Sequence, residues 1–272
     1  MGPDPSAARL AGKTAIIVGA GQTPGATIGN GRATAVLFAR NGAEVLVVDR
    51  DEGSAEETAS MIREEGGKAT VHVSDIASET ACSALADVAT RTFHGRVDIL
   101  HNNVGIGAGD ATPTRLTEDA WDAIIDVNLK AMWLTCKHVV PVMREQGAGS
   151  ITCVSSVASV AAAGNLTAYK VSKAGVNALV QALASTNARH GVRVNAILPG
   201  LIDTPMAVDA VARASGVSRE EVASVRASRV PMKRQGTAWD VAQAAVYLSS
   251  DEAAFVTGVL LPVDGGQCTM VG

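Results

Sequence analysis

The stretch TAIIVGAGQTPGATIGNGRATAVLFAR, residues 14–40, joins two predicted elements through a glycine-rich loop. Its first part, Thr14–Val18, is a short run rich in β-branched residues and predicts a strand, whereas Gly31–Asn41 is amphipathic and predicts a helix. Glycines at such a junction let the backbone approach a pyrophosphate at the helix N-terminus, where unpaired N–H groups favour an anion. The alternative is a flexible turn without a ligand, which the position between a strand and a helix disfavours. The stretch therefore predicts the start of a dinucleotide-binding fold.

The same order of strand and helix continues along the chain. Further β-branched runs predict strands at Glu44–Asp49, Ala69–Val73, Val97–His101, Ser150–Val154, Arg193–Leu198 and Val259–Val263. Amphipathic segments predict helices at Ser54–Glu65, Glu79–Phe93, Glu118–Arg144, Tyr169–His190 and Trp239–Ser249. Regular alternation of this kind is typical of βαβ crossovers. We therefore predict an α/β fold of the Rossmann type, a doubly wound, seven-stranded parallel sheet with helices on both faces.

The alternation also predicts the domain organisation. No Pro/Ser-rich linker, low-complexity block or internal repeat interrupts residues 1–272, so we expect a single domain. The alternation stops only between residues 201 and 236, where two short helical pieces are expected around Met206–Ala214 and Arg219–Ser228. In an open α/β sheet, an insertion after the carboxyl end of a strand overhangs the ligand crevice. We interpret residues 201–236 as a substrate lid.

The composition limits the kinds of molecule that the protein is expected to bind. The net charge is −4 and the basic residues are scattered, so we expect small molecules and no nucleic acid. The opening residues lack the apolar core of a signal peptide, and no apolar run is long enough to span a membrane, which predicts a cytoplasmic protein without membrane attachment. The cysteines show no C-x-x-C spacing, and we expect reduced thiols and no metal site at Cys82, Cys136, Cys153 and Cys268.

Acidic residues follow the second and third predicted strands. Asp49 ends the strand EVLVVD, where a carboxylate accepts hydrogen bonds from adenosine ribose hydroxyls and repels a 2′-phosphate. This predicts NAD as cofactor, although the neighbouring Arg50 could contact such a phosphate, and Asp49 could instead be a solvated loop acid or a helix cap. Asp75 and Ile76 follow the third strand and are predicted to meet the adenine, with a helix cap as the alternative for Asp75.

Tyr169 and Lys173 are four residues apart in a predicted helix, so their side chains share a face. An ammonium close to a phenol stabilises the phenolate and lowers the tyrosine pKa, which makes the phenol usable as an acid/base. Ser156 lies just past the carboxyl end of a strand, where its hydroxyl could bond a substrate oxygen. A surface tyrosine beside a solvated lysine is the alternative, and the strand-end serine together with the glycine-rich loop argues against it.

Together these residues resemble the short-chain dehydrogenase/reductase family, and the resemblance runs from about Leu10 to Gly266. Further matching positions are Asn102-Asn103-Val104-Gly105, Asn128 in DVNLKA, Ser156 in VSSVAS, Pro199-Gly200 followed by Thr204, and Val263-Asp264-Gly265-Gly266. The resemblance implies a homotetramer that moves a hydride between NAD(H) and a secondary alcohol or ketone.

The resemblance also implies residue roles. Tyr169 would donate or accept the proton, Ser156 would hold the substrate oxygen, and Lys173 would lower the tyrosine pKa and bind the nicotinamide ribose. Asn128 would hold a relay water, unless it only satisfies backbone groups. The remaining cofactor contacts are implied for Asn102 and Gly105 on the cofactor floor, and for Pro199, Ile202 and Thr204 beside the carboxamide. For Asn102 the alternative is a role in tying strands together.

The glycine-rich loop departs from the family pattern T-G-x-x-x-G-x-G. Gly19 is followed by Gly29 and Gly31 at a longer spacing, and Val18 replaces the usual threonine. The end of the loop, T-I-G-N-G-R-A, is similar to the loop of bacterial enoyl-acyl-carrier reductases, which implies that Thr27 faces the pyrophosphate with Ile28 beside it. We therefore expect residues 27–31 to contact the cofactor and residues 22–25 to bulge away.

Three functions remain open. The first is an NAD-dependent alcohol dehydrogenase or ketone reductase. The second is an enoyl-thioester reductase, disfavoured because that branch places its tyrosine and lysine seven residues apart. The third is a non-catalytic dinucleotide-binding protein, which would not need to keep serine, tyrosine, lysine and asparagine together. The substrate pocket is expected to be small and apolar, with Val157, Ala158, Asn165 and Met206 on its walls.

Overall fold

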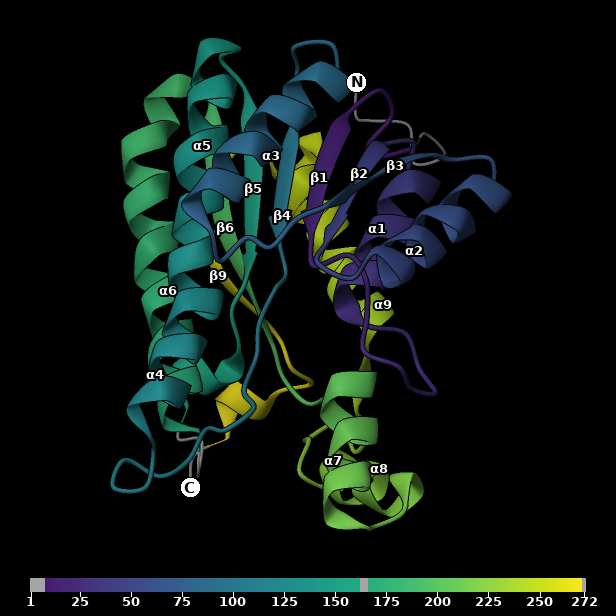
Figure 1. Ribbon diagram of the computed structural model, residues 1–272, viewed down its shortest axis with the longest axis vertical. Helices are drawn as coiled ribbons and strands as arrows, with labels where there is room; N and C mark the ends of the chain where they lie inside the picture. Colours follow the sequence, from purple (N-terminus) through teal and green to yellow (C-terminus); the bar gives the residue numbers. More distant parts are fainter. Residues whose placement is uncertain (1–7, 162–165, 271–272) are drawn as a thin grey trace.

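A seven-stranded parallel sheet forms the centre of the protein (Figure 1). The computed structural model describes residues 8–161 and 166–270. The strands follow the order β3-β2-β1-β4-β5-β6-β9, and every pair is parallel. Their bounds are β1 (Thr14–Val18), β2 (Glu44–Asp49), β3 (Lys68–Val73), β4 (Ile99–Asn102), β5 (Gly149–Val154), β6 (Val192–Pro199) and β9 (Leu260–Val263). All seven predicted strands are present, and the order reverses beside β1, which creates a ligand crevice at the carboxyl ends of β1 and β4.

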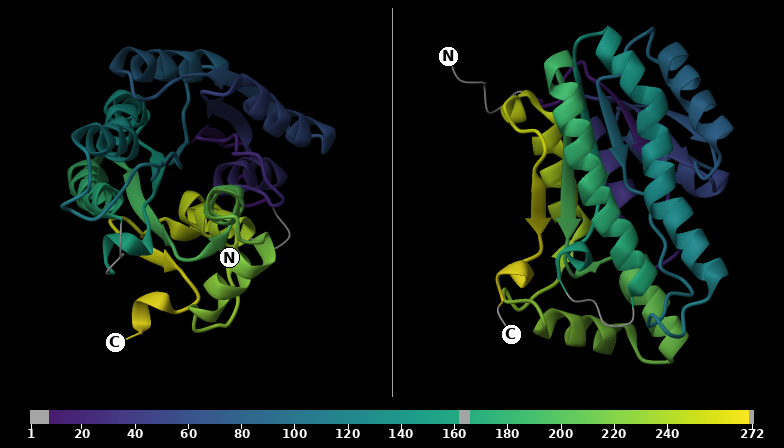
Figure 2. Two further views of the ribbon diagram at one scale, coloured as in Figure 1. Left: turned by 60° about the horizontal axis from the view of Figure 1, so that its bottom comes forward. Right: turned by 90° about the vertical axis from the view of Figure 1, so that its left-hand side faces the viewer.

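Helices cover both faces of this sheet, as the left view of Figure 2 shows along the strands. Neighbouring residues on a strand point to opposite faces, so the apolar strands feed two separate cores. One core lies under α1 (Asn30–Arg40), α2 (Glu52–Glu64) and α9 (Ala238–Ser249), and the other under α3 (Glu79–Thr92), α5 (Ala131–Glu145) and α6 (Thr167–Asn187). The predicted doubly wound α/β fold is confirmed.

The long helix predicted at Glu118–Arg144 is interrupted. It consists of α4 (Glu118–Ile125), a π-helical turn η1 (Asp126–Lys130) and α5. A π-helical turn holds an extra residue within a helix and often occurs at functional sites. Here it carries Asn128, whose side chain is fully buried. Apolar periodicity could not predict this turn, because the helix continues on both sides of it.

Residues 201–236, which we call the lid segment, lie at the carboxyl ends of the strands. Figure 1 and the right view of Figure 2 show α7 and α8 below the sheet. The segment is closed at its base by the short parallel pair of β7 and β8. Its elements are β7 (Ile202–Asp203), η4 (Pro205–Asp209), α7 (Ala210–Ser215), α8 (Arg219–Ser228) and β8 (Gly236–Thr237). Single helical turns elsewhere are η2 (Val157–Ser159), η3 (Ala188–His190), η5 (Asp251–Ala253) and η6 (Gln267–Thr269).

His101 on β4 gives the fold a sensitivity to acid. Its ring is fully buried, tilted against Phe38, and neither ring nitrogen has a polar partner among the described residues. Burial lowers the pKa of His101 to about 3. The unfolded chain, with a pKa of about 6.5, therefore binds the proton first as the pH falls, and stability is present above pH ~6.5 and lost below it.

We expect His101 to cost the protein about 2 kcal/mol of unfolding free energy between pH 7 and pH 5, at ~1.4 kcal/mol per pH unit below the unfolded pKa. Urea unfolding of the parent and of His101→Leu at both pH values measures this, and the variant should lose correspondingly less. The exposed His94 provides a control through His94→Asn, which should follow the parent. An equal loss in the parent and in His101→Leu would contradict the assignment.

Candidate active site

Tyr169 and Lys173 lie on one face of α6, one turn apart. Lys173 is only 2% exposed. Its Nζ donates a hydrogen bond to the carbonyl oxygen of Val154 at 2.8 Å, and it lies 5.7 Å from the centre of the Tyr169 ring. Because Val154 ends β5, the lysine ties the catalytic helix to the carboxyl edge of the sheet. The predicted juxtaposition of the phenol and the ammonium is present.

Ser156 follows β5 and faces the same site. Its backbone is extended, and its Oγ accepts a hydrogen bond from the N–H of Ala158 at 3.1 Å. The N–H bond uses one lone pair, so the hydroxyl proton and the second lone pair remain for a substrate oxygen or the phenol. The turn after Ser156 is held by the Ser159 hydroxyl, which donates to the Ser156 carbonyl oxygen and accepts from Asn177.

Burial controls the protonation of both ionisable groups. It raises the pKa of the Tyr169 phenol above its ordinary value, while the Ser156 hydroxyl acts in the opposite direction. It lowers the pKa of Lys173 to about 8. The expected lowering of the tyrosine pKa by Lys173 stays a prediction.

Asn128 reaches the same site from the π-helical turn. Its Oδ1 accepts from the Ile106 N–H at 2.7 Å, and its Nδ2 donates to the Ile106 carbonyl at 2.9 Å and to the Ser172 hydroxyl at 3.1 Å. Asn128 therefore does satisfy backbone groups, but those of the loop after β4 rather than of its own helix. Gly105 lies between Asn128 and Lys173, because a Cβ there would be 3.7 Å from Oδ1 and 3.1 Å from Nζ. A relay water at Asn128 stays a prediction.

Asp110 was not predicted from the sequence, yet it caps the first turn of α6. The residue before α6 is Leu166, which has no side-chain acceptor for the first N–H groups. Asp110 supplies one from the loop after β4. Its Oδ2 accepts from the Tyr169 N–H at 2.8 Å, and its Oδ1 accepts from the Ala168 N–H at 3.1 Å. Because Asp110 is far from α6 in the sequence, no residue pattern next to the helix indicates that it is the cap.

Asp110→Ala is expected to lower kcat about tenfold and the free energy of unfolding by about 1–2 kcal/mol, because the first turn of α6 loses its acceptor and Tyr169 shifts. NADH affinity should change little. Thr117→Ala is the matched control, since Thr117 caps α4 locally. It should lose stability with little loss of kcat. Equal effects of the two variants on kcat would show that Asp110 does not position Tyr169.

The glycine-rich loop crosses the start of α1 at very short range. Gly19 has a φ of +76°, and a Cβ on Gly31 would collide with the Gly19 carbonyl oxygen. Asn103, which sequence reasoning quoted without assigning a role, donates from Nδ2 to that same oxygen at 3.0 Å. The N–H groups of Asn30 and Gly31 open α1 and have no partner among the described residues. This close backbone cradle at a helix N-terminus fits a pyrophosphate.

The lengthened part of the loop is closed at its base by Gln22. Its Oε1 accepts from the Gly29 N–H at 2.9 Å, and its Nε2 donates to the Thr27 carbonyl at 3.5 Å. Residues Thr23–Ile28, which we call the insert, therefore leave the loop as an excursion. The Thr27 hydroxyl is enclosed and has no polar partner in the described ranges, and Ile28 packs on the core under α1.

This corrects the sequence-based assignment of the loop. Gln22 stays at the base of the loop instead of bulging away. Thr27 and Ile28 belong to the insert, with the Thr27 hydroxyl enclosed and Ile28 packed on the core, and their predicted contact with the pyrophosphate stays a prediction. The end of the loop that borders the cradle is Gly29–Gly31.

Asp49 ends β2 beside this loop and is partly buried. Its Oδ2 accepts from the Gly21 N–H at 2.9 Å, and its Oδ1 accepts from the Asp51 N–H at 3.1 Å. An ionised carboxylate has about four acceptor positions, so each oxygen keeps one for a ribose hydroxyl. Arg50 is exposed and forms no ion pair with any residue that the structure describes.

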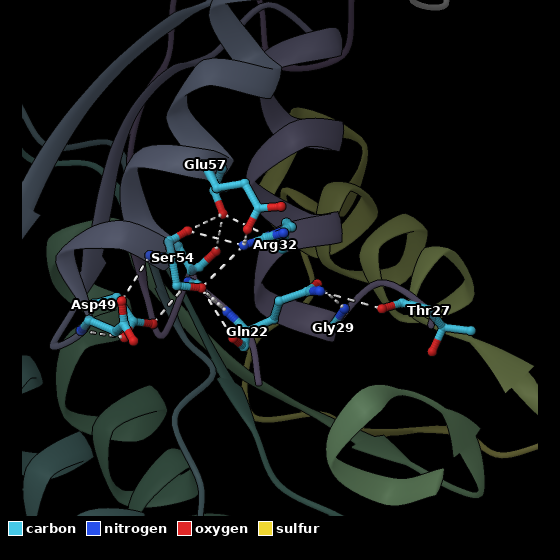
Figure 3. A network of polar contacts seen from close by, with 11 residues as sticks. Gln22, Thr27, Gly29, Arg32, Asp49, Ser54 and Glu57 are labelled. Carbon is cyan, nitrogen blue, oxygen red and sulfur yellow. Dashed lines mark hydrogen bonds and ion pairs between the residues drawn. The ribbon is translucent and has the colours of Figure 1, made fainter. Parts of the chain in front are cut away.

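Figure 3 shows how the loop is fastened to α2. Ser54 Oγ accepts from the Gln22 N–H at 2.8 Å and donates to the Gln22 carbonyl at 3.1 Å. Arg32, which is nearly buried, donates to Ser54 Oγ at 3.1 Å and pairs with Glu57 at 2.6 Å. These contacts hold the loop against α2, next to the Asp49 carboxylate, before any ligand arrives.

Other residues predicted to contact the cofactor lie near the same edge of the sheet, and their cofactor contacts stay predictions. Asp75 is exposed and its Oδ1 accepts from the Ala77 N–H at 3.1 Å, while Ser78 rather than Asp75 caps α3. Ile76 is buried in the core. Asn102 is only 1% exposed, and its Oδ1 accepts from the Thr135 hydroxyl at 2.9 Å. The side chain of Asn102 therefore ties β4 to α5, and a contact of Asn102 with the cofactor stays a prediction.

The segment after β6 carries the residues predicted to hold the carboxamide. Pro199 ends β6 opposite Val263, and the following turn is held by Gln267, whose Oε1 accepts from the Leu201 N–H at 2.7 Å. Ile202 and Thr204 are nearly buried at the start of the lid segment.

The predicted pocket walls differ in exposure. Ala158 is nearly buried, Val157 is partly buried, and Met206 is 52% exposed. Asn165 lies outside the described residues. Met206 is therefore open to solvent at the site rather than enclosed by the pocket.

Two further findings concern the whole described part of the chain. None of its helices is both long and apolar enough to cross a membrane. A cavity of about 450 Å³ lies at the opposite, amino ends of the strands, near Lys13, Asp98 and Arg193. It contains none of the site residues, so it does not compete with the strand carboxyl ends as the place of the chemistry.

The fold and the site define an α/β oxidoreductase in which Ser, Tyr, Lys and Asn meet beside a dinucleotide loop. The family model described as enoyl-(acyl carrier protein) reductase matches residues 25–267. The chain belongs to the short-chain dehydrogenase/reductase family of oxidoreductases.

Three relatives show the breadth of this family. The 3-oxoacyl-[acyl-carrier-protein] reductase FabG of Thermotoga maritima is 37% identical over 95% of this chain and 98% of its own. The cis-4-hydroxycyclohexanecarboxylate dehydrogenase of Sinomonas cyclohexanicum is 37% identical over 89% of this chain and 93% of its own. Levodione reductase of Leifsonia aquatica is 33% identical, covering 95% of both chains.

Solved structures agree with the fold. Carveol dehydrogenase from Mycobacterium avium, in complex with NAD, superposes with a TM-score of 0.88 at 30% identity, covering 96% of this chain and 99% of its own. A protein from Beutenbergia cavernae, described as an NAD(P)-dependent gluconate 5-dehydrogenase with NADP at low occupancy, has a TM-score of 0.86 at 36% identity, covering 97% and 99%.

Proposed function

We propose that this protein is an NAD-dependent oxidoreductase that interconverts a secondary alcohol and a ketone, with Tyr169 as general acid/base. The observation that carries this proposal is the convergence of Tyr169, Lys173 and Ser156 at the carboxyl end of β5, next to the glycine cradle. A bound nicotinamide dinucleotide supplies or accepts the hydride. The protein's own residues hold the substrate oxygen and move its proton.

Each side chain has a distinct task. The Ser156 hydroxyl bonds the substrate oxygen and holds it next to Tyr169. The phenol Oη gives its proton to that oxygen in reduction and takes the proton back in oxidation. Lys173, whose pKa is lowered to about 8, remains mostly charged at neutral pH and stabilises the phenolate when it forms. Asn128, which is bonded to the backbone of Ile106, is proposed to hold the water through which a proton returns from solvent.

NAD is the proposed cofactor because of Asp49. Its partly buried carboxylate has free acceptor positions for ribose hydroxyls and would face the charge of a 2′-phosphate. The structural relatives do not decide between the two cofactors, since one holds NAD and another NADP. The proposal therefore depends on the residue at the end of β2.

The proposed substrate is a modest apolar molecule, such as an alicyclic alcohol or ketone. Val157 and Ala158 are small apolar residues beside Ser156, and Met206 lies at the start of the lid segment. Relatives named for a cyclohexanecarboxylate, for levodione and for carveol support this class. The FabG relative keeps oxoacyl thioesters as the other carbonyl class to be tested.

The test follows NADH absorbance with the purified protein. Alicyclic alcohols are offered with NAD, and alicyclic ketones, oxoacyl thioesters and enoyl thioesters are offered with NADH. Turnover of an alicyclic pair supports the proposal. Turnover of enoyl thioesters alone would replace it with an enoyl reductase, an outcome that the four-residue Tyr–Lys spacing disfavours. NADH binding without turnover of any compound would favour a non-catalytic dinucleotide-binding protein.

We also propose a homotetramer. Trp133 on α5 and Val171 on α6 are each 44% exposed, on the two helices that the family resemblance implies pair across a two-fold axis. Large apolar side chains left open on such helices are consistent with burial against a second copy.

A further inference from the structure

The insert Thr23–Ile28 is an addition to an otherwise ordinary loop. Without it, Gly19 would be followed by three residues, then Gly29, one residue and Gly31, which is the family spacing G-x-x-x-G-x-G. The two ends of the insert are already neighbours, because a Cβ on Gly29 would lie 3.1 Å from the Gln22 Cβ and 4.0 Å from its Cα. The insert therefore leaves and re-enters the loop at one point.

Beyond this base, the insert contacts the lid segment rather than the cradle. The Ala26 N–H donates to Asp209 Oδ1 at 3.0 Å, and Arg213 Nη1 donates to the Pro24 carbonyl at 3.3 Å. A Cβ on Gly25 would lie 2.7 Å from Pro205 Cβ and 2.8 Å from Asp209 Cγ, so only a glycine fits there. In Figure 1 the purple loop between β1 and α1 descends beside α7 accordingly.

Asp209 connects the insert to the rest of the lid segment. It is only 11% exposed, and its Oδ2 faces the Nε of Arg219 at 3.5 Å. Arg219 begins α8 and also pairs with Asp203 of β7 at 2.5 Å. The insert, η4, α8 and β7 are therefore joined through one carboxylate and one guanidinium. A partly buried pair of this kind is stronger than an exposed surface pair.

We propose that the insert is functionally part of the substrate lid: it positions the lid segment over the reacting carbonyl through Asp209, and it contributes little to holding the dinucleotide. The expected effect on substrate KM rests on the proposed function, whereas the expected effect on the position of the lid segment does not. Asp209 is then a positioning residue: it holds the lid segment in place and does not touch the reacting atoms.

The experiment compares three variants with the parent. The first deletes residues 23–28 and joins Gln22 to Gly29. The second is Asp209→Ala, which keeps the insert and removes its acceptor. The third, Glu220→Gln, is the matched control, because Glu220 is an exposed acid on α8 without a hydrogen bond or ion pair among the described residues.

The first readout needs no turnover. The lid segment offers trypsin several exposed sites, at Arg213, Arg229, Lys233 and Arg234. We expect cleavage within residues 210–234 to be about tenfold faster in the deletion variant and in Asp209→Ala, and unchanged in Glu220→Gln. The NADH dissociation constant, measured by fluorescence, should stay within about threefold of the parent in all variants. If the deletion variant does not fold, the cleavage rate and NADH affinity of Asp209→Ala still test the proposal.

The second readout uses whichever compound the substrate panel identifies. We expect its KM to rise about tenfold in the first two variants, while the KM for NADH is little changed. Unchanged cleavage of the lid segment would overturn the proposal. A loss of NADH affinity by more than tenfold would also overturn it, because it would show that the insert helps to bind the cofactor. If the panel finds no substrate, the cleavage and binding results still stand, so failure of the two proposals can be told apart.

Discussion

Tyr169→Phe is expected to lower turnover by at least about a thousandfold and to leave the NADH dissociation constant within about threefold of the parent. The ring and its packing remain, but the phenolic proton that must reach the substrate oxygen is lost. The measurement pairs steady-state turnover with fluorescence titration of NADH.

Tyr247 provides the control for this variant. It lies on α9, is 36% exposed, and is the only other tyrosine of the sequence. Tyr247→Phe should therefore keep parental turnover. If Tyr169→Phe kept turnover within tenfold of the parent, the phenol would not be the acid/base, whatever its position beside Lys173.

The second large effect concerns cofactor choice. The unmodified protein is expected to prefer NAD over NADP by about a hundredfold or more in kcat/KM, because the Asp49 carboxylate would lie at contact distance from a 2′-phosphate, and unpaired like charges at such a site are strongly unfavourable. Asp49→Ala should narrow this gap, chiefly by weakening NAD, with the exposed Arg50 then free to contact the phosphate.

Two comparisons separate charge from loop structure. Asp49 also accepts the Gly21 N–H, so Asp49→Ala disturbs the loop as well as removing a charge. Asp49→Asn keeps an acceptor and should narrow the gap with a smaller loss of NAD affinity. Glu52→Gln removes a nearby exposed charge on α2 and should change nothing. Equal use of both cofactors by the parent, or an unchanged preference in Asp49→Ala, would show that the end of β2 does not select the cofactor.

Local sequence patterns predicted the strands, the helix faces and the residues at strand ends, because each of these depends on residues close together in the sequence. The strands β1 and β2 begin and end where the predicted runs do, because each is buried on both faces and is followed by a glycine or a charged residue. Tyr169 and Lys173 were placed on one helix face because residues four apart are neighbours on the surface of a helix. Ser156 and Asp49 were found because the ends of parallel strands meet at one edge of the sheet.

Contacts between distant segments could not be predicted in this way. Asp110 caps a helix that begins 57 residues later, and Asn103 bonds a carbonyl 84 residues earlier. The side chain of Asn102 points into the core because β4 alternates its faces, which a motif match does not reveal. The path of the loop could not be predicted, because the hydrogen bond from Gly29 to Gln22 shortens the loop in space but not in sequence.

The protein contains two irregularities of length, and both affect the site more than the core. The insert spans six residues, but its ends lie next to each other, so the loop can be closed without it and α1 need not move. The π-helical turn η1 holds about one surplus residue within a helix. A one-residue deletion there would return the helix to regular α geometry and leave the phase of α5 relative to α4 unchanged. It would remove the wide turn that places Asn128 against the backbone of Ile106. The length of this chain can therefore change at either place with little effect on the sheet, whereas the side chains that the two segments bring to the site would be lost from it.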